Sequence, residues 1–398
     1  MVRKVVRRDR YLRILDSYRS NPDLVKVVTG VRRSGKSELL RQFRQLLLDD
    51  GVPERDVIHI DLEERRYVID SERMMYEYIR GMIPSKGAYI LLDEVQLVRG
   101  WERVVETLRL EFGANIYITG SNAQMVSSEL GTHLTGRFVE ISILPFSFRE
   151  FVERYPVDAD NGYTQRFIQY LRWGGMPIID LDDDEAKNRA ILRGVYDSIV
   201  NNDIRMRVEL DQSTLENVTA FMMSNIGNLV SRQAITRGAG IGDQRTVEKY
   251  LGELCRCFVF YKADRYDIIG RSHMATNAKF YTVDTGLRNT VLYGSEYNEA
   301  ALLENAVFIE LVRRGYRVSF GSYRNHEVDF TAWKGDEPEF YQVALSLHSG
   351  NTLEREVRTF RSMGAGARMF IVTLDRDPAD VPDGVEVVNA VDWMLDGE

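Results

Sequence analysis

Eight consecutive residues, from Gly30 to Ser37, have the types and spacing of a phosphate-binding loop. They read GVRRSGKS and match the pattern G-x-x-x-x-G-K-[ST]. Glycine lets the backbone wrap closely around an anion, so that amide groups and the start of the following helix point at phosphates. Lys36 would reach the β- and γ-phosphates, and the Ser37 hydroxyl would bind Mg²⁺. The predicted phosphate-binding residues are Gly30, Arg33, Ser34, Gly35, Lys36 and Ser37.

Two adjacent carboxylates, Asp93 and Glu94, follow an apolar run over residues 88–92. An apolar strand that ends in acids is typical of a Walker B segment, in which Asp93 would hold Mg²⁺ mostly through water. Glu94 would orient and polarise the water that attacks the γ-phosphate. A strand that ends in a solvated acidic turn is a common alternative. The phosphate-binding loop upstream favours the catalytic interpretation.

Three further residues are candidates for catalysis. Ser121 and Asn122 end another β-branched run, where a neutral polar group could bridge the γ-phosphate and the attacking water. Arg137 lies on a turn, and a guanidinium can stabilise the charge that spreads over a transferring phosphoryl group. Alone, these signals are weak, because polar turns and surface arginines are common.

The surrounding residues predict the elements that position these groups. Residues 24–150 alternate short apolar runs with helical patterns, which is typical of an α/β sandwich with a mostly parallel sheet. The predicted strands cover residues 24–28, 57–62, 88–94 and 115–122. The first strand leads directly into the glycine-bounded loop, and helical spacing begins directly after it.

Five motifs occur in one order along the chain: GVRRSGKS, LLDEVQ, TGSN, LTGR and LPFSFREF. With them the chain resembles the prokaryotic predicted AAA+ ATPases that carry a C-terminal endonuclease-like domain. The resemblance implies ATP and Mg²⁺ as cofactors and Ser121 or Asn122 as a sensor. It implies that Arg137 is an arginine finger acting on a neighbouring subunit, and therefore a homo-oligomer, for which a hexameric ring is one arrangement.

The chain divides into four predicted domains. They are an AAA+ P-loop core (1–150), a helical lid (151–211), a winged helix (212–287) and a restriction-endonuclease-like PD-(D/E)xK domain (288–398). Within the lid, the segment WGGMP at 173–177 breaks any helix, because it holds two glycines and a proline. The resemblance assigns this segment to a lid over the nucleotide, and a plain turn between helices is the alternative.

The winged helix is predicted from three short helices and a following pair of strands at 258–262 and 279–283. Ser231 and Asp243 are the expected caps of the second and third helices. The third helix of this arrangement can enter a major groove of DNA. Use of the domain for protein contacts alone is the alternative. The basic residues that could contact DNA phosphates are Arg245, Lys249, Arg265, Arg271 and Lys279.

The last hundred residues resemble the core of PD-(D/E)xK nucleases, with a helix at 301–310 and several strands after it. By that resemblance Glu304 and Asp329 match the first two metal-binding carboxylates. The third position should read acid-x-Lys, but it reads Gln342, Val343 and Ala344. A neutral amide and a methyl group cannot replace a metal ligand and a lysine. We therefore expect a vestigial, inactive nuclease fold that is retained for binding DNA or a partner.

Composition sets further limits. The chain has 398 residues and a net charge of −8. This charge argues against binding of nucleic acid over the whole surface, but it does not exclude a local basic patch. It has no apolar run of 18 residues and no apolar segment after its basic start, so we expect neither a membrane partner nor a signal peptide. Cys255 and Cys257 are expected to be packing residues in a reducing cytoplasm.

The leading hypothesis is an ATP hydrolase that binds DNA, duplex or branched, and remodels or translocates it. The first alternative is a signalling switch whose nucleotide state controls assembly with a protein partner. The second is an ATP-gated DNA nuclease. ATP hydrolysis that DNA stimulates, with a steep salt dependence, distinguishes the first hypothesis from the switch.

Overall fold

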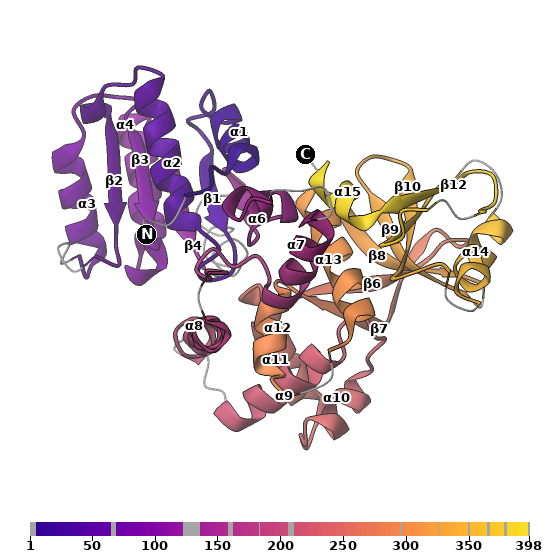
Figure 1. Cartoon of the computed structure of the whole chain (residues 1–398). Coiled ribbons are helices and arrows are strands. Elements are labelled where there is room, and N and C mark those ends of the chain that lie inside the picture. Colours follow the sequence, from indigo (N-terminus) through magenta and orange to yellow (C-terminus); the bar gives the residue numbers. More distant parts are fainter. Residues whose placement is uncertain are drawn as a thin grey trace. The chain divides into compact units, whose positions relative to one another are not determined.

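The chain folds into two compact units. In the computed structural model, one unit comprises Met1–Pro145 with Arg256–Phe258, and the other comprises Phe146–Cys255 with Val259–Glu398. Figure 1 shows the chain with its helices and strands labelled and coloured along the sequence. The structure describes residues 5–64, 69–121, 136–157, 162–182, 184–205, 211–294, 297–324, 326–348, 351–363, 367–377 and 380–396.

The first unit is built on a five-stranded sheet in the order β2-β3-β4-β1-β5, in which every pairing is parallel. The strands are β1 (Val25–Thr29), β2 (Val57–Asp61), β3 (Tyr89–Asp93), β4 (Asn115–Gly120) and β5 (Phe138–Ser142). The strand order separates β1 from β3 by one strand. The carboxyl end of β4 therefore lies between the loop after β1 and the two acids at the end of β3.

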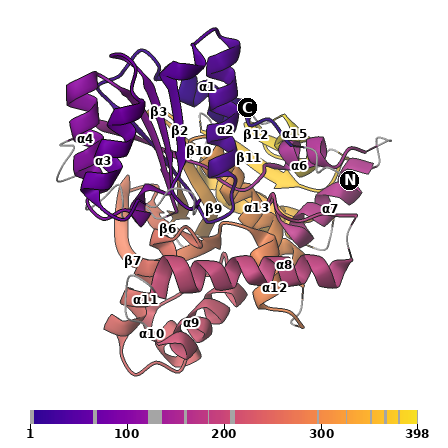
Figure 2. The ribbon, with the colours of Figure 1, turned by 90° about the vertical axis from the view of Figure 1, so that its left-hand side faces the viewer.

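Helices cover both faces of this sheet (Figure 2). The helices are α1 (Asp9–Ser17), α2 (Lys36–Asp49), α3 (Glu72–Met82) and α4 (Trp101–Phe112), and two short 3₁₀ turns are η1 (Glu54–Asp56) and η2 (Val95–Leu97). Helices α1 and α2 bury residues such as Leu15 and Phe43 against one face of the sheet. Helices α3 and α4 bury residues such as Ile79 and Trp101 against the other. The predicted α/β sandwich with a parallel sheet is thereby confirmed.

The second unit begins with helices. They are α6 (Phe148–Arg154), α7 (Gly162–Trp173), α8 (Glu185–Ser198), the π-helical segment η4 (Ile199–Arg205), α9 (Gln212–Ser224), α10 (Arg232–Gly238) and α11 (Gln244–Arg256). The two predicted caps are present. Ser231 Oγ accepts a hydrogen bond from the Ala234 amide at 3.1 Å, and Asp243 Oδ1 accepts one from the Thr246 amide at 2.9 Å. These side chains satisfy amide groups that the first turn of a helix leaves unpaired.

A seven-stranded mixed sheet forms the rest of the second unit, in the order β12-β11-β10-β9-β8-β6-β7. The strands are β6 (Phe260–Asp267), β7 (Ser272–Thr282), β8 (Arg317–Tyr323), β9 (His326–Trp333), β10 (Pro338–Ala344), β11 (Arg368–Thr373) and β12 (Val385–Asn389). Strand β6 pairs antiparallel with β7 and parallel with β8. The expected boundary at residue 287 thus does not separate two sheets. The hairpin predicted for the winged helix forms one edge of the C-terminal sheet.

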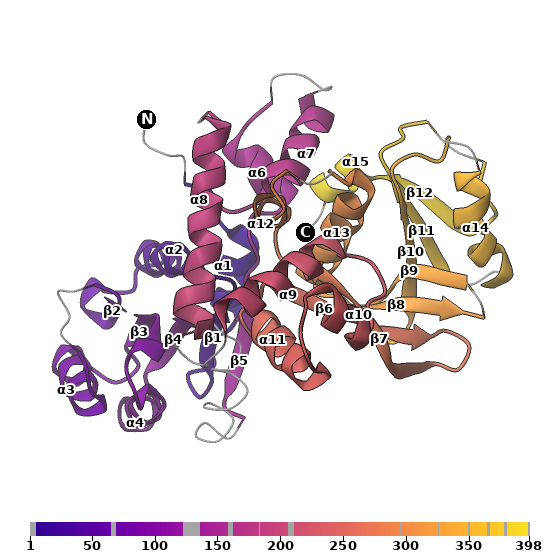
Figure 3. The same cartoon turned by 90° about the horizontal axis from the view of Figure 1, so that it is seen from below.

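Two helices flank this sheet on opposite sides (Figure 3). The remaining helices of the unit are α12 (Thr285–Val291), α13 (Glu299–Arg313), α14 (Thr352–Met363) and α15 (Ala390–Leu395). Phe308 of α13 stacks on Tyr281 of β7 with ring centroids 4.1 Å apart. Phe360 of α14 packs with Phe340 and Ile371. Within the described ranges, no helix has both the length and the apolar character that crossing a membrane requires.

Candidate nucleotide-binding site

The backbone of the predicted phosphate loop requires glycine at both of its ends. Gly30 has φ of 147°, and a Cβ atom built there would lie 2.3 Å from the carbonyl oxygen of Ile143. Gly35 is left-handed, with φ of 102°, and directly precedes α2. Because L side chains rarely adopt such angles, these two glycines allow the chain to turn from β1 into α2 within six residues. The exposed Arg33 between them is also left-handed, with φ of 64°.

Lys36 is folded back into this loop. Its side chain is 3% exposed, and its ammonium donates hydrogen bonds to the carbonyl oxygens of Gly30 at 3.0 Å and Val31 at 3.3 Å. The buried hydroxyl of Ser34 has no hydrogen-bond partner among the described residues. An ammonium and an unsatisfied hydroxyl in a glycine-bounded loop fit the phosphates of a nucleotide, because phosphate oxygens accept hydrogen bonds from both.

Thr119 joins the two predicted catalytic acids. Its hydroxyl donates a hydrogen bond to Asp93 Oδ1 and accepts one from the Glu94 amide at 2.9 Å. Glu94 adopts a left-handed backbone with φ of 52°, and its Oε2 accepts a hydrogen bond from Gln96. A non-glycine residue in this region costs about 1–3 kcal/mol and persists only where its surroundings hold it. Thr119 and Gln96 belong to the motifs TGSN and LLDEVQ, but the sequence gave neither a role, because their contacts with Asp93 and Glu94 depend on how the strands pair and turn.

Asp93 is buried beside this hydroxyl, at 1% exposure. The pKa of its carboxyl is raised to about 6, mainly by burial; hydrogen bonds from Ser37 and Thr119 oppose this rise, and the charges of Glu94 and Asp61 add to it. Glu94 Oε1 lies 3.9 Å from the Lys36 ammonium. A hard divalent cation that is held mainly by oxygen ligands fits this pair of carboxylates together with the Ser37 hydroxyl.

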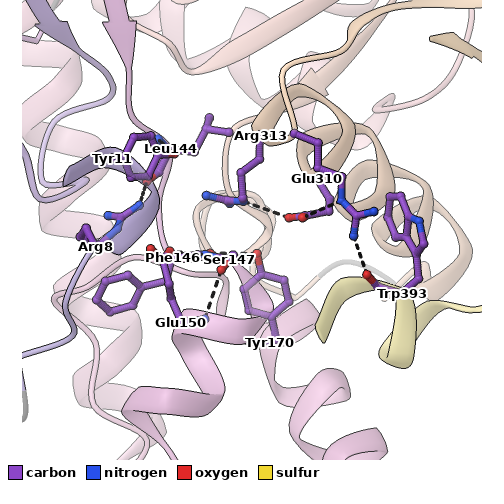
Figure 4. Close-up of polar contacts among 11 residues, drawn as sticks. Arg8, Tyr11, Leu144, Phe146, Ser147, Glu150, Tyr170, Glu310, Arg313 and Trp393 are labelled. Carbon is purple, nitrogen blue, oxygen red and sulfur yellow. Dashed lines mark hydrogen bonds and ion pairs between the residues drawn. The ribbon is translucent and has the colours of Figure 1, made fainter. Parts of the chain in front are cut away.

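Arg8 hydrogen-bonds the backbone of the phosphate loop, a role that was not predicted from the sequence. Its guanidinium is buried and donates hydrogen bonds to the carbonyl oxygens of Ser34 at 3.2 Å and Leu144 at 2.9 Å. The Leu144 amide donates to the hydroxyl of Tyr11 at 3.1 Å (Figure 4). Leu144 directly follows Ile143, whose carbonyl lies against Gly30. Arg8 therefore ties the phosphate loop to the segment that follows β5, a link of 136 residues in sequence that no local pattern shows.

The remaining predicted catalytic residues lie in different places. Ser121 is buried directly after β4, at the edge of the sheet that carries the acids. Asn122 lies outside the described residues. Arg137 is exposed at the start of β5, where its carbonyl accepts a hydrogen bond from the Val25 amide at 3.0 Å. Since Val25 begins β1, Arg137 stands at the opposite edge of the sheet, roughly 16 Å from the phosphate loop at 3.3 Å per residue.

The predicted vestigial nuclease residues line one cavity of about 460 Å³ in the second unit, where Glu304, Asp329 and Gln342 come together. The predicted DNA-binding residue Lys279 belongs to this cluster instead, which corrects the expectation. Its buried ammonium lies 2.6 Å from Glu327 and 3.4 Å from Glu304. An ammonium so paired cannot reach a DNA backbone.

Gln342 connects the backbone of β9 to a carboxylate on α14. Its Oε1 accepts a hydrogen bond from the Asp329 amide, and its Nε2 donates one to Glu356 Oε2, both at 2.7 Å. Glu356 comes from α14 and was not predicted. Burial, followed by the charge of Glu304, raises the pKa of Asp329 well above its usual value. Within the described part of the chain, no group of three or more His, Cys, Asp or Glu residues is arranged to hold a metal ion.

The other predicted DNA contacts are at the surface. Arg245 and Lys249 are exposed on α11, and Arg271 is exposed in the turn between β6 and β7. Arg265 is half-buried and donates a hydrogen bond to Ser322 Oγ at 2.8 Å. Three of the five predicted basic residues therefore remain accessible to a large ligand.

Two family models match parts of this chain. A family model described as an AAA domain matches residues 22–152, and a model described as a domain of unknown function (DUF8612) matches residues 164–297. An uncharacterized protein of Haemophilus influenzae is 38% identical over 99% of this chain and 100% of its own length. The chain belongs to the family of this Haemophilus protein. The uncharacterized protein MJ1544 of Methanocaldococcus jannaschii is 28% identical over 90% of this chain and 81% of its own.

Two solved structures show limited similarity. The replication initiator DnaA bound to AMPPCP and single-stranded DNA aligns with 64% of this chain and 89% of its own, at 16% identity and a TM-score of 0.31. The Thermotoga maritima RuvB Holliday junction branch migration motor aligns with 68% of this chain and 92% of its own, at 13% identity and a TM-score of 0.34. TM-scores of this size carry no argument about function. The AAA assignment rests on the domain match and on the P-loop geometry.

The burial of Asp93 predicts a gain in stability when its charge is removed. Its folded-state pKa of about 6 exceeds the unfolded value of about 3.9. The stability that the protonated carboxyl contributes is therefore fully present below the unfolded pKa and is lost as the pH rises through 6. Asp93→Asn should therefore raise the free energy of unfolding of the nucleotide-free protein at pH 7.5 by up to about 3 kcal/mol. Urea titrations at pH 4 and pH 7.5 measure this difference.

The control for that measurement is Asp61→Asn, which removes a half-buried carboxylate paired in register with Asp93 on the neighbouring strand. It should change stability much less. A loss of stability in Asp93→Asn at pH 7.5 would contradict the proposed cost of burying this charge.

Proposed function

We propose that the protein is a Mg²⁺-dependent ATP hydrolase that works as a homo-oligomer on DNA. One observation carries the ATPase part: at the carboxyl edge of one parallel sheet, Glu94 lies within ion-pair distance of Lys36, and Thr119 hydrogen-bonds both Asp93 and the Glu94 amide. A P-loop lysine beside two strand-end acids is the constellation that binds a nucleoside triphosphate with its metal. The AAA domain match supports the same assignment.

The chain's residues divide the chemistry between them. When ATP binds, the Lys36 ammonium would exchange its hydrogen bonds to the loop carbonyls for contacts with the β- and γ-phosphates. The Ser34 hydroxyl would then gain a hydrogen-bond partner. Bound Mg²⁺ would be held by Ser37 and Asp93 and would neutralise charge on the phosphates. Glu94, held by its strained backbone and by Gln96, would accept a proton from the attacking water. Thr119 would keep the two acids in register with each other.

The proposed homo-oligomer follows from the position of Arg137. An arginine that stabilises phosphoryl charge must lie within hydrogen-bonding distance of the γ-phosphate. Arg137 stands at the sheet edge opposite to its own phosphate loop and cannot serve that loop. If it is a finger, it serves the site of a neighbouring copy. A hexameric ring is one closed arrangement of such head-to-tail contacts.

DNA is the proposed partner because α9, α10 and α11 with the β6–β7 hairpin follow the plan of a winged helix. A single antiparallel bridge joins Val230, before α10, to Ala278 of β7, which places the hairpin next to the helices. Arg245 and Lys249 project from the exposed side of α11. The signalling switch remains the alternative, and it predicts bound nucleotide with negligible turnover and no response to DNA.

The ATPase proposal predicts different defects in two variants. Lys36→Ala should largely abolish nucleotide binding, because it removes the charge that faces the β- and γ-phosphates. Glu94→Gln should retain binding but slow hydrolysis by roughly 10²-fold or more, since an amide cannot accept the proton of water. Equilibrium binding of labelled ATP and a phosphate-release assay measure the two effects. Normal ATP affinity in folded Lys36→Ala protein would refute the P-loop assignment.

The shared site predicts complementation between two inactive variants. Arg137→Ala protein should bind ATP and hydrolyse it slowly. Mixed with Glu94→Gln protein, it should recover part of the activity, because some interfaces then pair an intact arginine with an intact Glu94. ATPase rates across mixing ratios measure this recovery. If subunits exchange and no ratio restores activity, Arg137 does not act on a neighbouring site.

The DNA proposal predicts binding without cutting. Affinity for DNA should fall as salt rises, because each neutralised phosphate releases counterions. Arg245→Glu with Lys249→Glu should weaken binding across sequences and leave basal ATP hydrolysis intact, as fluorescence anisotropy and phosphate release would show. The matched control is Arg80→Glu with Lys86→Glu, the same charge change on exposed residues of the first unit.

The same samples should show no Mg²⁺- or Mn²⁺-dependent nicking of plasmid DNA, because Gln342 and Ala344 replace the acid and the lysine. Nicking that both Asp329→Ala and Glu356→Gln abolish would instead support the ATP-gated nuclease. Unchanged DNA binding in the α11 double variant would remove this helix from the contact surface.

A further inference from the structure

Three arginines surround a cavity of about 190 Å³ in the second unit, away from the carboxylate cluster described above. We call it the arginine cavity. Its cationic lining comes from Arg172 at the end of α7, Arg189 of α8 and Arg288 of α12. Its aromatic lining comes from Trp173, Tyr293 and Tyr297.

Arg288 is a buried cation without an acidic partner. The residue is 4% exposed. Its Nε donates to the Met223 carbonyl at 3.1 Å and its Nη1 to Asn289 Oδ1 at 3.0 Å. Among the described residues, no hydrogen bond is made by its Nη2, and no carboxylate forms an ion pair with it. Burial lowers the pKa of Arg288, and only Tyr297 opposes that effect. A buried charge without a counter-charge is costly, which marks Arg288 as a group with an absent anionic partner.

Arg189 also has no ion pair among the described residues. Its guanidinium lies 3.9 Å from the ring centroid of Tyr293 and 5.7 Å from that of Trp173, so aromatic faces hold it at the cavity. Arg193, one turn further along α8, pairs with Asp197 at 3.0 Å instead. The helix thus neutralises its outer arginine and leaves the one at the cavity unpaired.

The other two arginines line the same cavity as Tyr297. The pKa of the Tyr297 hydroxyl is raised to about 12, mainly by burial; Glu299 adds to this rise, and the charges of Arg172 and Arg288 oppose it. Arg172 bonds the exposed Glu185 at 2.7 Å. Among the described lining residues, three guanidiniums therefore meet at one small cavity, and Glu185 partners only the outermost.

The WGGMP segment holds this cavity in shape. A Cβ on Gly175 would lie 2.2 Å from the Phe146 carbonyl oxygen, and one on Gly286 would lie 1.9 Å from that of Trp173. Asp284 caps α12 through the Leu287 amide at 3.0 Å and also accepts from the Gly175 amide at 2.7 Å. The glycines permit these close backbone contacts, which fix the end of α7 against α12. Trp173 and Arg288, which both line the cavity, belong to these two helices.

We propose that the arginine cavity binds a phosphate group. Guanidinium groups match phosphate oxygens with paired hydrogen bonds, and several arginines around one anion are the usual solution for a doubly charged group. The volume is several times the roughly 30 Å³ of one water, which suits a small oxyanion with a few waters. The phosphate comes either from a free nucleoside monophosphate or from the backbone of single-stranded nucleic acid.

The test measures phosphate binding in the full-length Lys36→Ala protein, so that the P-loop does not compete. Isothermal titration calorimetry with inorganic phosphate, at constant ionic strength in chloride, should show one site. Adding Arg189→Ala should weaken binding by about tenfold or more, because it removes a charge-assisted contact. Arg193→Ala is the matched control on the same helix and should leave affinity unchanged. Arg288→Lys should also weaken binding, since it keeps the charge without the paired donors.

Competition then identifies the source. Displacement of phosphate by a single-stranded oligonucleotide without terminal phosphates would support the nucleic-acid backbone. Displacement by AMP alone would support a free mononucleotide. No binding of phosphate, or equal affinity in the Arg189→Ala and Arg193→Ala proteins, would overturn the proposal. Because the P-loop is disabled in every sample, this result is independent of the proposed ATPase.

Discussion

Parallel pairing of β1, β4 and β3 is the constraint on which the nucleotide site depends. In a parallel sheet the carboxyl ends of neighbouring strands meet at one edge, and here that edge receives the phosphate loop, Thr119 and the two acids. Register matters as much as direction. Because Leu92 pairs with Ile118, Asp93 and Thr119 reach the edge together and can share a hydrogen bond. A slip of one residue would turn the hydroxyl to the other face.

This edge concentrates unfavourable features that ordinary core positions avoid. Lys36 and Asp93 are buried charges, Glu94 has a left-handed backbone, and Ser34 has an unsatisfied hydroxyl. Each costs free energy in the nucleotide-free protein, and a bound triphosphate with its metal would relieve most of them together. The hydrogen bonds of Arg8 to the loop and to Leu144 explain how the loop keeps its shape under these costs.

Local features of the fold were predictable from the sequence, and features that depend on distant pairing were not. Periodicity located β1, β3 and β4, and the caps at Ser231 and Asp243 correctly marked two helix starts. Thr119, Arg8 and Glu356 could not be found this way. Each acts through a contact across 14 to 136 residues, and each is an unremarkable residue in its own segment. The pairing of β6 with β8 was not predicted for the same reason, because local spacing does not determine the order of strands in a sheet.

The fates of Lys279 and Arg288 show why a basic residue cannot be assigned to DNA from sequence alone. Both are buried, Lys279 within β7 and Arg288 within α12, which follows β7 in the chain. Lys279 points at Glu304 and Glu327, so its charge is satisfied within the protein. Among the described residues, Arg288 donates hydrogen bonds to a carbonyl and an amide oxygen and has no ion pair, so its charge is not satisfied there. What distinguishes them is the surrounding charge. A buried cation with acids around it is part of the structure, whereas one without them has a place for an anion.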